Sequence, residues 1–164
     1  MTTPLVAIIM GSKSDWDVMS RAARILTDFG VPHECRVMSA HRTPDLVTHY
    51  TQAAAGRGIE VIIAGAGMAA ALPGCIAAHT TVPVLGVPLE NGPLGGKDAL
   101  YAIVQMPPGI PVGCMGIGAP GAANAGLLAV SILAGKYPEY REKLTAYRVE
   151  QARKIEETVL PPLG

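Results

Sequence analysis

The sequence is short of charged residues, of cysteine and of several motifs that mark common classes of enzyme. Its 164 residues hold 13 lysines and arginines against 13 aspartates and glutamates, so neither nucleic acid nor an anionic membrane is expected as a partner. Cys35, Cys75 and Cys114 form no CxxC pair, which favours a reduced, cytoplasmic setting over a disulfide framework. The opening MTTPLVAIIMGSKSD lacks a basic start and a long apolar run, so we expect no signal peptide.

Charge is scarcest in the middle of the chain. Between residues 59 and 135 the charged residues are only Glu60, Glu90, Lys97 and Asp98. Glycine and proline interrupt this stretch every few residues, so it holds no apolar helix of the roughly 20 residues that a membrane span needs. The composition instead indicates a parallel sheet that is buried on both faces. It also suggests that sister subunits cover part of the surface, as in a homo-oligomer.

Several motifs are absent. The chain has no HExxH sequence and no pair of histidines four residues apart, so a zinc site is not expected. It has no GxSxG nucleophile elbow and no Walker lysine motif. The stretch GAGMAAALPG contains G-x-G without the third glycine of a dinucleotide site, and Val84 and Leu85 stand where a ribose-binding acid is expected. NAD is therefore not expected as a ligand.

Short apolar runs alternate with helical segments along the chain. We predict strands at residues 5–10, 33–38, 60–64, 83–87 and 111–117. Helices are predicted between them, and the charged segment 138–159 is predicted to be an additional C-terminal helix. This alternation predicts a parallel sheet with helices on both faces, within a single domain that spans residues 1–164.

Ligands of such sheets bind at the carboxyl ends of the strands, which here carry the loops GSKSD, SAHRT and GAGMAA. In the first loop, Ser12 or Ser14 can cap a helix, and free N–H groups at a helix start suit a phosphate. Asp15 can accept hydrogen bonds from ribose hydroxyls. The alternative is an ordinary helix start, with Asp15 as a first-turn acid.

The second loop supplies His41 and Arg42. Arginine can bind a phosphate through two parallel hydrogen bonds, and a histidine can give and take a proton near neutral pH. The alternatives are a surface ion pair for Arg42 and a structural loop histidine for His41. The third loop offers little reactive chemistry, because its glycines either expose backbone N–H groups or serve tight packing, and Met68 with the alanines forms an apolar wall. Such a pocket suits isomerisation or carbon–carbon chemistry on a small phosphorylated substrate.

Six motifs occur in a fixed order: GSKSDW, SAHRTP, VIIAGAG, VPVLGVP, AIVQMPPGIPV and NAGLLAVSIL. In combination they resemble the class I 5-(carboxyamino)imidazole ribonucleotide mutases of bacterial purine biosynthesis, over residues 5–137. The resemblance implies a flavodoxin-like, three-layer αβα sandwich with an extra C-terminal helix. It implies a homo-octamer in which residues 138–159 pack on neighbouring subunits. It also implies an isomerase that moves a carboxylate from the exocyclic nitrogen to carbon 4 of an aminoimidazole ribonucleotide, with no cofactor and no metal.

The resemblance also implies roles for individual residues. His41 would be the catalytic proton shuttle. The substrate-binding residues would be Ser12, Asp15, Ser39, Arg42, Gly65, Ala66, Gly67, Met68 and Ala69. Among them, the backbone of residues 65–67 would complete the phosphate and carboxylate cradle, and the apolar side chains would keep the reacting carbon dioxide from water.

The third loop departs from the family pattern, which usually reads GAGGAAHLPG. Met68 stands in place of a glycine and Ala71 in place of a histidine. Three alternatives therefore stay open. They are a related pyridinium carboxylase, a class II carboxylase that uses free carbon dioxide and typically has lysine where this chain has Arg42, and a nucleotide-binding relative without catalytic activity.

Overall fold

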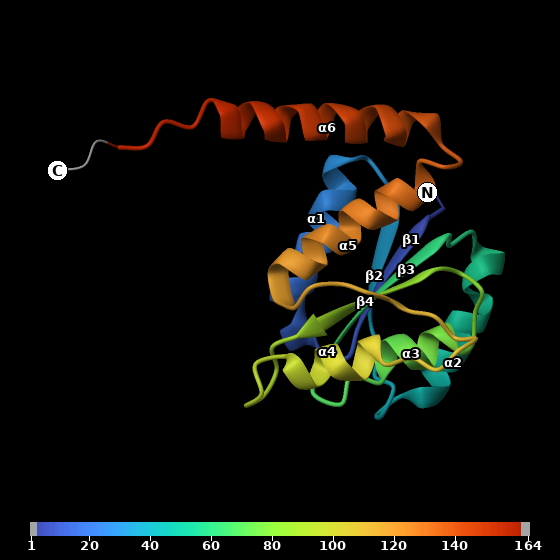
Figure 1. The fold of residues 1–164 in the computed structure, drawn as a ribbon. Helices are drawn as coiled ribbons and strands as arrows, with labels where there is room; N and C mark the ends of the chain where they lie inside the picture. Colours follow the sequence, from blue (N-terminus) through green and yellow to red (C-terminus); the bar gives the residue numbers. More distant parts are fainter. Residues whose placement is uncertain (1–2, 162–164) are drawn as a thin grey trace.

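A computed structural model describes residues 3–161, and it contains one sheet of five parallel strands (Figure 1). The strands are β1 (Val6–Met10), β2 (His33–Val37), β3 (Val61–Gly67), β4 (Val84–Leu89) and β5 (Gly113–Cys114). Their order across the sheet is β2-β1-β3-β4-β5. This is the order of flavodoxin-like folds, so the predicted fold class is confirmed.

Helices cover both faces of the sheet. They are α1 (Trp16–Asp28), α2 (Pro44–Ala54), α3 (Leu72–Ala77), α4 (Lys97–Val104), α5 (Gly118–Leu133) and α6 (Pro138–Glu156), with short 3-10 turns η1 (Lys13–Asp15) and η2 (Ala55–Arg57). Helices α1 and α5 pack on one face, and α2, α3 and α4 pack on the other (Figure 1). The result is the predicted three-layer αβα sandwich.

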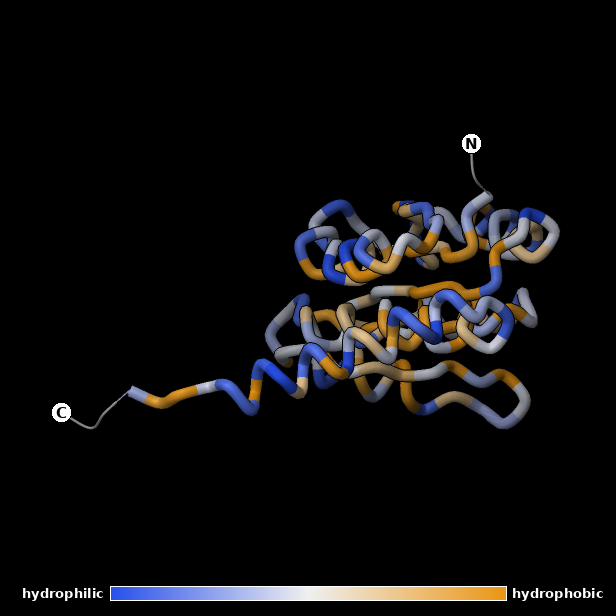
Figure 2. The backbone as a smooth tube through the Cα atoms, turned by 90° about the horizontal axis from the view of Figure 1, so that it is seen from above, coloured by the Kyte–Doolittle hydropathy of each residue, from blue (hydrophilic) through white to orange (hydrophobic). Residues whose placement is uncertain are grey.

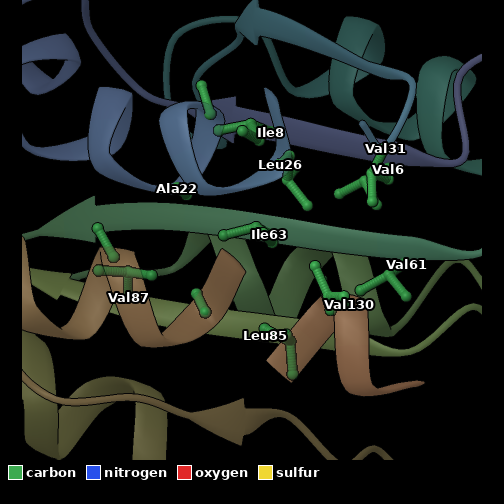
Figure 3. Close-up of a cluster of buried hydrophobic side chains, with 14 of the residues drawn as sticks. Val6, Ile8, Ala22, Leu26, Val31, Val61, Ile63, Leu85, Val87 and Val130 are labelled. Atoms are coloured by element: carbon green, nitrogen blue, oxygen red, sulfur yellow. The ribbon is translucent and has the colours of Figure 1, made fainter. Parts of the chain in front are cut away.

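The central strands are buried on both faces, as their continuous apolar sequences predict. In β1, Ile8 points toward α1 and α5, where it joins Leu26 and Val130 in one core (Figure 3). The next residue, Ile9, points to the opposite face and packs in the second core beside α2 and α3. Alternation along each strand therefore places one apolar core on each side of the sheet.

Several boundaries differ from the sequence-based expectation, most of all in β3 and β5. Strand β3 continues to Gly67, so the G-x-G stretch ends a strand instead of forming a loop. Strand β5 has only two residues, because only Gly113 and Cys114 pair with β4 at this edge of the sheet. Helix α5 begins at Gly118, directly after the segment 111–117 that was predicted to be a strand.

Helix α6 extends beyond the body of the domain (Figures 1 and 2). Tyr140 is its one buried residue among those described, and Tyr147 packs against Phe29. Farther along, Val149 and Ile155 are 65% and 76% exposed. The predicted C-terminal helix is confirmed, and its packing on neighbouring subunits stays a prediction.

A polar cluster ties the edge strand β2 to the end of α2. Tyr50 and Arg57 both donate hydrogen bonds to the carboxylate of Glu34. Burial alone would raise the pKa of Glu34, but these hydrogen bonds and the charge of Arg57 outweigh it and hold that pKa below its usual value. Burial and the bond to Glu34 raise the pKa of Tyr50 to about 12, so its hydroxyl stays a donor. The cluster anchors both elements that flank the SAHRT loop.

The turn between β3 and α3 carries backbone strain. Met68 and Ala70 have φ angles of 56° and 39°, and they are the only non-glycine residues with positive φ in the described range 3–161. The turn is closed by a hydrogen bond of 3.0 Å from the Ala70 N–H to the Gly67 carbonyl. Left-handed backbone costs a residue with a Cβ roughly 1–2 kcal/mol, so the fold has to hold this turn in place.

Replacing Met68 with glycine is expected to stabilise the protein by about 0.5–1 kcal/mol. Glycine has no Cβ, so it avoids the free-energy cost of a left-handed backbone. Its greater conformational entropy in the unfolded chain offsets only part of this gain in stability. Little burial is lost, because Met68 is 58% exposed. Chemical denaturation of the wild type and the variant at equal chain concentration measures the difference.

Ala69→Gly is the matched control, since Ala69 is exposed in the same turn and does not have a positive φ. This control is expected to be destabilised by about 0.5–1 kcal/mol. Equal losses of stability in both variants would show that the backbone of Met68 is not strained.

Candidate functional site

A cavity of about 690 Å³ opens at the carboxyl edge of the sheet. The segments that follow β1, β2, β3 and β4 all contribute to it, as the parallel topology predicts. Its lining residues are Gly11, Ser12, Ser14, Asp15, Ser39, Ala40, His41, Arg42, Ala66, Gly67, Met68, Ala69, Ala70, Ala71, Leu72 and Asn91. Nine of the ten predicted site residues are therefore together in one place.

The β1–α1 turn presents a hydroxyl and a carboxylate. Ser12 caps η1, where its Oγ accepts from the Ser14 N–H at 3.3 Å and from the Ser14 hydroxyl at 2.9 Å. In return, the Ser12 N–H donates to Asp15 Oδ2 at 2.9 Å, which completes a capping box. Asp15 is only 5% exposed, although it lines the cavity. The predicted cap is confirmed, and it fixes the position of a buried acid.

The loop after β2 holds its own shape through Ser39 and Thr43. The Ser39 N–H donates to Thr43 Oγ1 at 2.9 Å, and Ser39 Oγ accepts from the Arg42 N–H at 3.2 Å. Arg42 Nη2 donates to the Gly11 carbonyl at 2.7 Å, so the guanidinium reaches across to the β1–α1 turn. Arg42 is not part of a surface ion pair within residues 3–161, and its remaining N–H groups are available to an anion.

His41 belongs to the same loop after β2, lines the cavity and is exposed. In the part of the chain that the structure describes, its ring makes no hydrogen bond with another protein group. Pro44 starts α2 directly after the loop, as its position in the sequence predicts. The imidazole is thus placed where both of its nitrogens can meet a ligand.

The end of β3 forms an apolar wall. Ala66, Gly67, Met68 and Ala69 all line the cavity, as predicted. Gly65 does not line it, because it lies inside β3 above Met19, whose Sδ would be 2.4 Å from a Cβ at that position. Gly65 is thus the one predicted site residue that does not line the cavity, and its backbone role in substrate binding stays a prediction. Its lack of a side chain lets Met19 pack beneath the strand.

Both departures from the family pattern quoted above face the cavity, since Met68 and Ala71 line it. Sequence reasoning overlooked Asn91, which follows β4 and lines the same cavity. Its Nδ2 donates to Asp15 Oδ1 at 2.8 Å. The available signal was its position just after a strand, at the same edge as the other three loops.

The described residues offer no ready metal site. Within residues 3–161, no three histidine, cysteine, aspartate or glutamate side chains are grouped as metal ligands. A search of the same residues finds no helix with the length and apolar character of a membrane span.

Comparison with known proteins identifies the family. A family model described as AIR carboxylase matches residues 5–154. The N5-carboxyaminoimidazole ribonucleotide mutase of Aquifex aeolicus (strain VF5) is 61% identical over 141 residues, which cover 86% of this chain and 83% of that protein. The protein of the same name from Pseudomonas aeruginosa is 55% identical over 151 residues, or 92% of this chain and 93% of that one.

The fold comparison agrees with the sequence comparison. A crystal structure of PurE from Treponema denticola matches with a TM-score of 0.83 and 29% identity, covering 94% of this chain and 95% of that chain. The family predicted from the six motifs is confirmed, and this chain belongs to the AIR carboxylase family.

Proposed function

We propose that this protein is an N5-carboxyaminoimidazole ribonucleotide mutase, an isomerase that moves a carboxylate from the exocyclic nitrogen to carbon 4 of its substrate. One observation carries the proposal. A single cavity combines hydroxyl, carboxylate and guanidinium groups, one free imidazole and an apolar wall. The relatives named above, at 61% and 55% identity, carry the same activity in their names.

The polar side of the cavity binds the ribose phosphate. Ser12, Ser39 and the unused N–H groups of Arg42 donate to the phosphate oxygens. Asp15 accepts hydrogen bonds from the ribose hydroxyls, because both of its oxygens retain lone pairs after their bonds to the protein. These contacts place the aminoimidazole head group beside His41.

The reaction needs only one group that transfers a proton. The bond between the exocyclic nitrogen and the carboxylate carbon breaks, and its electron pair stays on nitrogen as carbon dioxide forms. Ring carbon 4 then attacks the carbon dioxide, and a carbon–carbon bond replaces the lost bond. His41 takes the hydrogen of carbon 4 as a proton and delivers it to the nitrogen. No proton or electron is gained or lost overall, so the protein needs no cofactor.

The wall formed by Ala66, Gly67, Met68 and Ala69 holds the carbon dioxide. Apolar side chains offer carbon dioxide no hydrogen bonds and exclude water that would protonate the ring carbon too early. Confinement beside carbon 4 also replaces a bimolecular encounter with an intramolecular one.

The mutase is expected to convert 5-(carboxyamino)imidazole ribonucleotide to 4-carboxy-5-aminoimidazole ribonucleotide without ATP or added bicarbonate. Ultraviolet absorbance of the carbon-carboxylated product follows the reaction. Turnover of aminoimidazole ribonucleotide that depends on bicarbonate would identify a carboxylase instead. Binding without turnover of either ribonucleotide would identify a non-catalytic relative.

His41→Asn is expected to lower kcat by about 10²–10⁴-fold, since an amide retains hydrogen bonding but cannot shuttle a proton. The dissociation constant for the product should change little. The matched control is His49→Asn, because His49 is an exposed histidine of α2 that does not line the cavity. Equal kcat values for His41→Asn and the wild type would exclude His41 as the proton shuttle.

We also propose a homo-octamer. On α5, Leu128 and Ile132 lie one turn apart and are 39% and 38% exposed. On α6, Val149 and Ile155 are exposed on a helix that extends away from its own domain (Figure 2). Burying these side chains between chains would remove apolar surface from water.

Light scattering on the purified protein is expected to give a mass of about 136 kDa, which is eight chains of 17.0 kDa. The value should hold on tenfold dilution, because obligate interfaces are large and apolar. A mass of one or two chains would rule out the octamer and leave the proposed reaction untouched.

A further inference from the structure

The side chain of Asn91 connects two loops that are far apart in the sequence. Its Nδ2 donates to Asp15 Oδ1 at 2.8 Å, across a separation of 76 residues. Asn91 follows β4 and Asp15 follows β1, and β3 lies between these strands in the sheet. The hydrogen bond therefore passes over the end of β3 at the mouth of the cavity.

A glycine at the end of β3, Gly67, leaves room for the Asn91 side chain. A Cβ at Gly67 would lie 2.8 Å from the Asn91 Cβ and 3.0 Å from its Nδ2, closer than packed atoms normally approach. Any larger residue at position 67 would displace the amide from Asp15. The absence of a side chain at Gly67 therefore leaves the space in which Asn91 reaches Asp15.

Asp15 is held from two sides by uncharged donors. The Ser12 N–H donates to Oδ2 at 2.9 Å, and Asn91 donates to Oδ1. Together these bonds fix the carboxylate plane. Neither donor carries a charge, so neither forms an ion pair with Asp15, and both carboxylate oxygens retain free lone pairs.

We propose that Asn91 is a positioning residue that aims Asp15 at the ribose hydroxyls and so sets the affinity for ribonucleotides. The proposal rests on the function argued above. Asn91 acts through Asp15 and takes no part in proton transfer. Its loss therefore weakens binding of the ribonucleotide and leaves the chemical step unchanged.

The test is a double-mutant cycle with steady-state kinetics and calorimetric binding of the carbon-carboxylated product. Asn91→Leu keeps the number and branching of the side-chain heavy atoms and removes the donor. KM and the product Kd should rise about tenfold or more, because the carboxylate of Asp15 is no longer held toward the ribose. The value of kcat should stay within threefold of wild type. Asp15→Ala should raise KM and Kd at least as much.

Adding Asn91→Leu to Asp15→Ala should produce no further change, because the residue through which Asn91 acts is gone. Gln52→Leu is the matched control, an exposed amide on α2 that does not line the cavity. If Asp15→Ala fails to fold, Asp15→Asn replaces it, and the effect of Asn91→Leu should then shrink to less than threefold.

Two results would overturn the proposal and leave the mutase function standing. One is an Asn91→Leu variant with KM and Kd within twofold of wild type. The other is additive effects in the double variant, which would mean that Asn91 binds substrate directly. Failure of the proposed function looks different, because the wild type would then show no turnover of the carboxyamino substrate.

Discussion

Parallel pairing in register brings the ends of four strands to one edge, and the site depends on this alignment. Met10 of β1 pairs with Val37 on one side and with Gly65 on the other, and Gly65 pairs in turn with Val87. Each of these four strands ends within a few residues of this row of paired residues. Backbone hydrogen bonds therefore decide where the loops meet, and the side chains decide only what chemistry is done there.

Small residues let these layers and loops approach closely. A Cβ at Gly126 of α5 would lie 2.9 Å from the Ile25 Cβ of α1, so this glycine lets the two helices pack tightly on one face. In β3, Gly65 lets the Met19 side chain pack against the strand, and Gly67 lets the Asn91 side chain approach the end of the strand at the cavity. The cost of so many glycines is conformational entropy, which is offset by burying apolar strands on both faces.

The sequence was sufficient to predict the layers, the parallel sheet and three of the four loops. Apolar runs predict the strands. Because ligands of such sheets bind at the carboxyl ends of the strands, the sequence also predicts that Ser12, Asp15, His41 and Arg42 lie at one site. The position of Asn91 just after a strand could be seen in the sequence, but its hydrogen bond to Asp15 could not, because that contact depends on the spatial order β1-β3-β4. The length of β5 is set by its pairing with β4, which involves only two residues. The apolar sequence of this segment does not contain that information.

The two charged groups of the cavity are not paired with each other. Arg42 donates to the Gly11 carbonyl and to Ser39 Oγ, and Asp15 accepts from a backbone N–H and an amide. Neither takes part in an ion pair among residues 3–161. A salt bridge between them would have neutralised both charges inside the protein. Because the protein holds each group with neutral partners, both keep the capacity for further hydrogen bonds, which supports the proposed binding of the phosphate by Arg42 and of the ribose hydroxyls by Asp15.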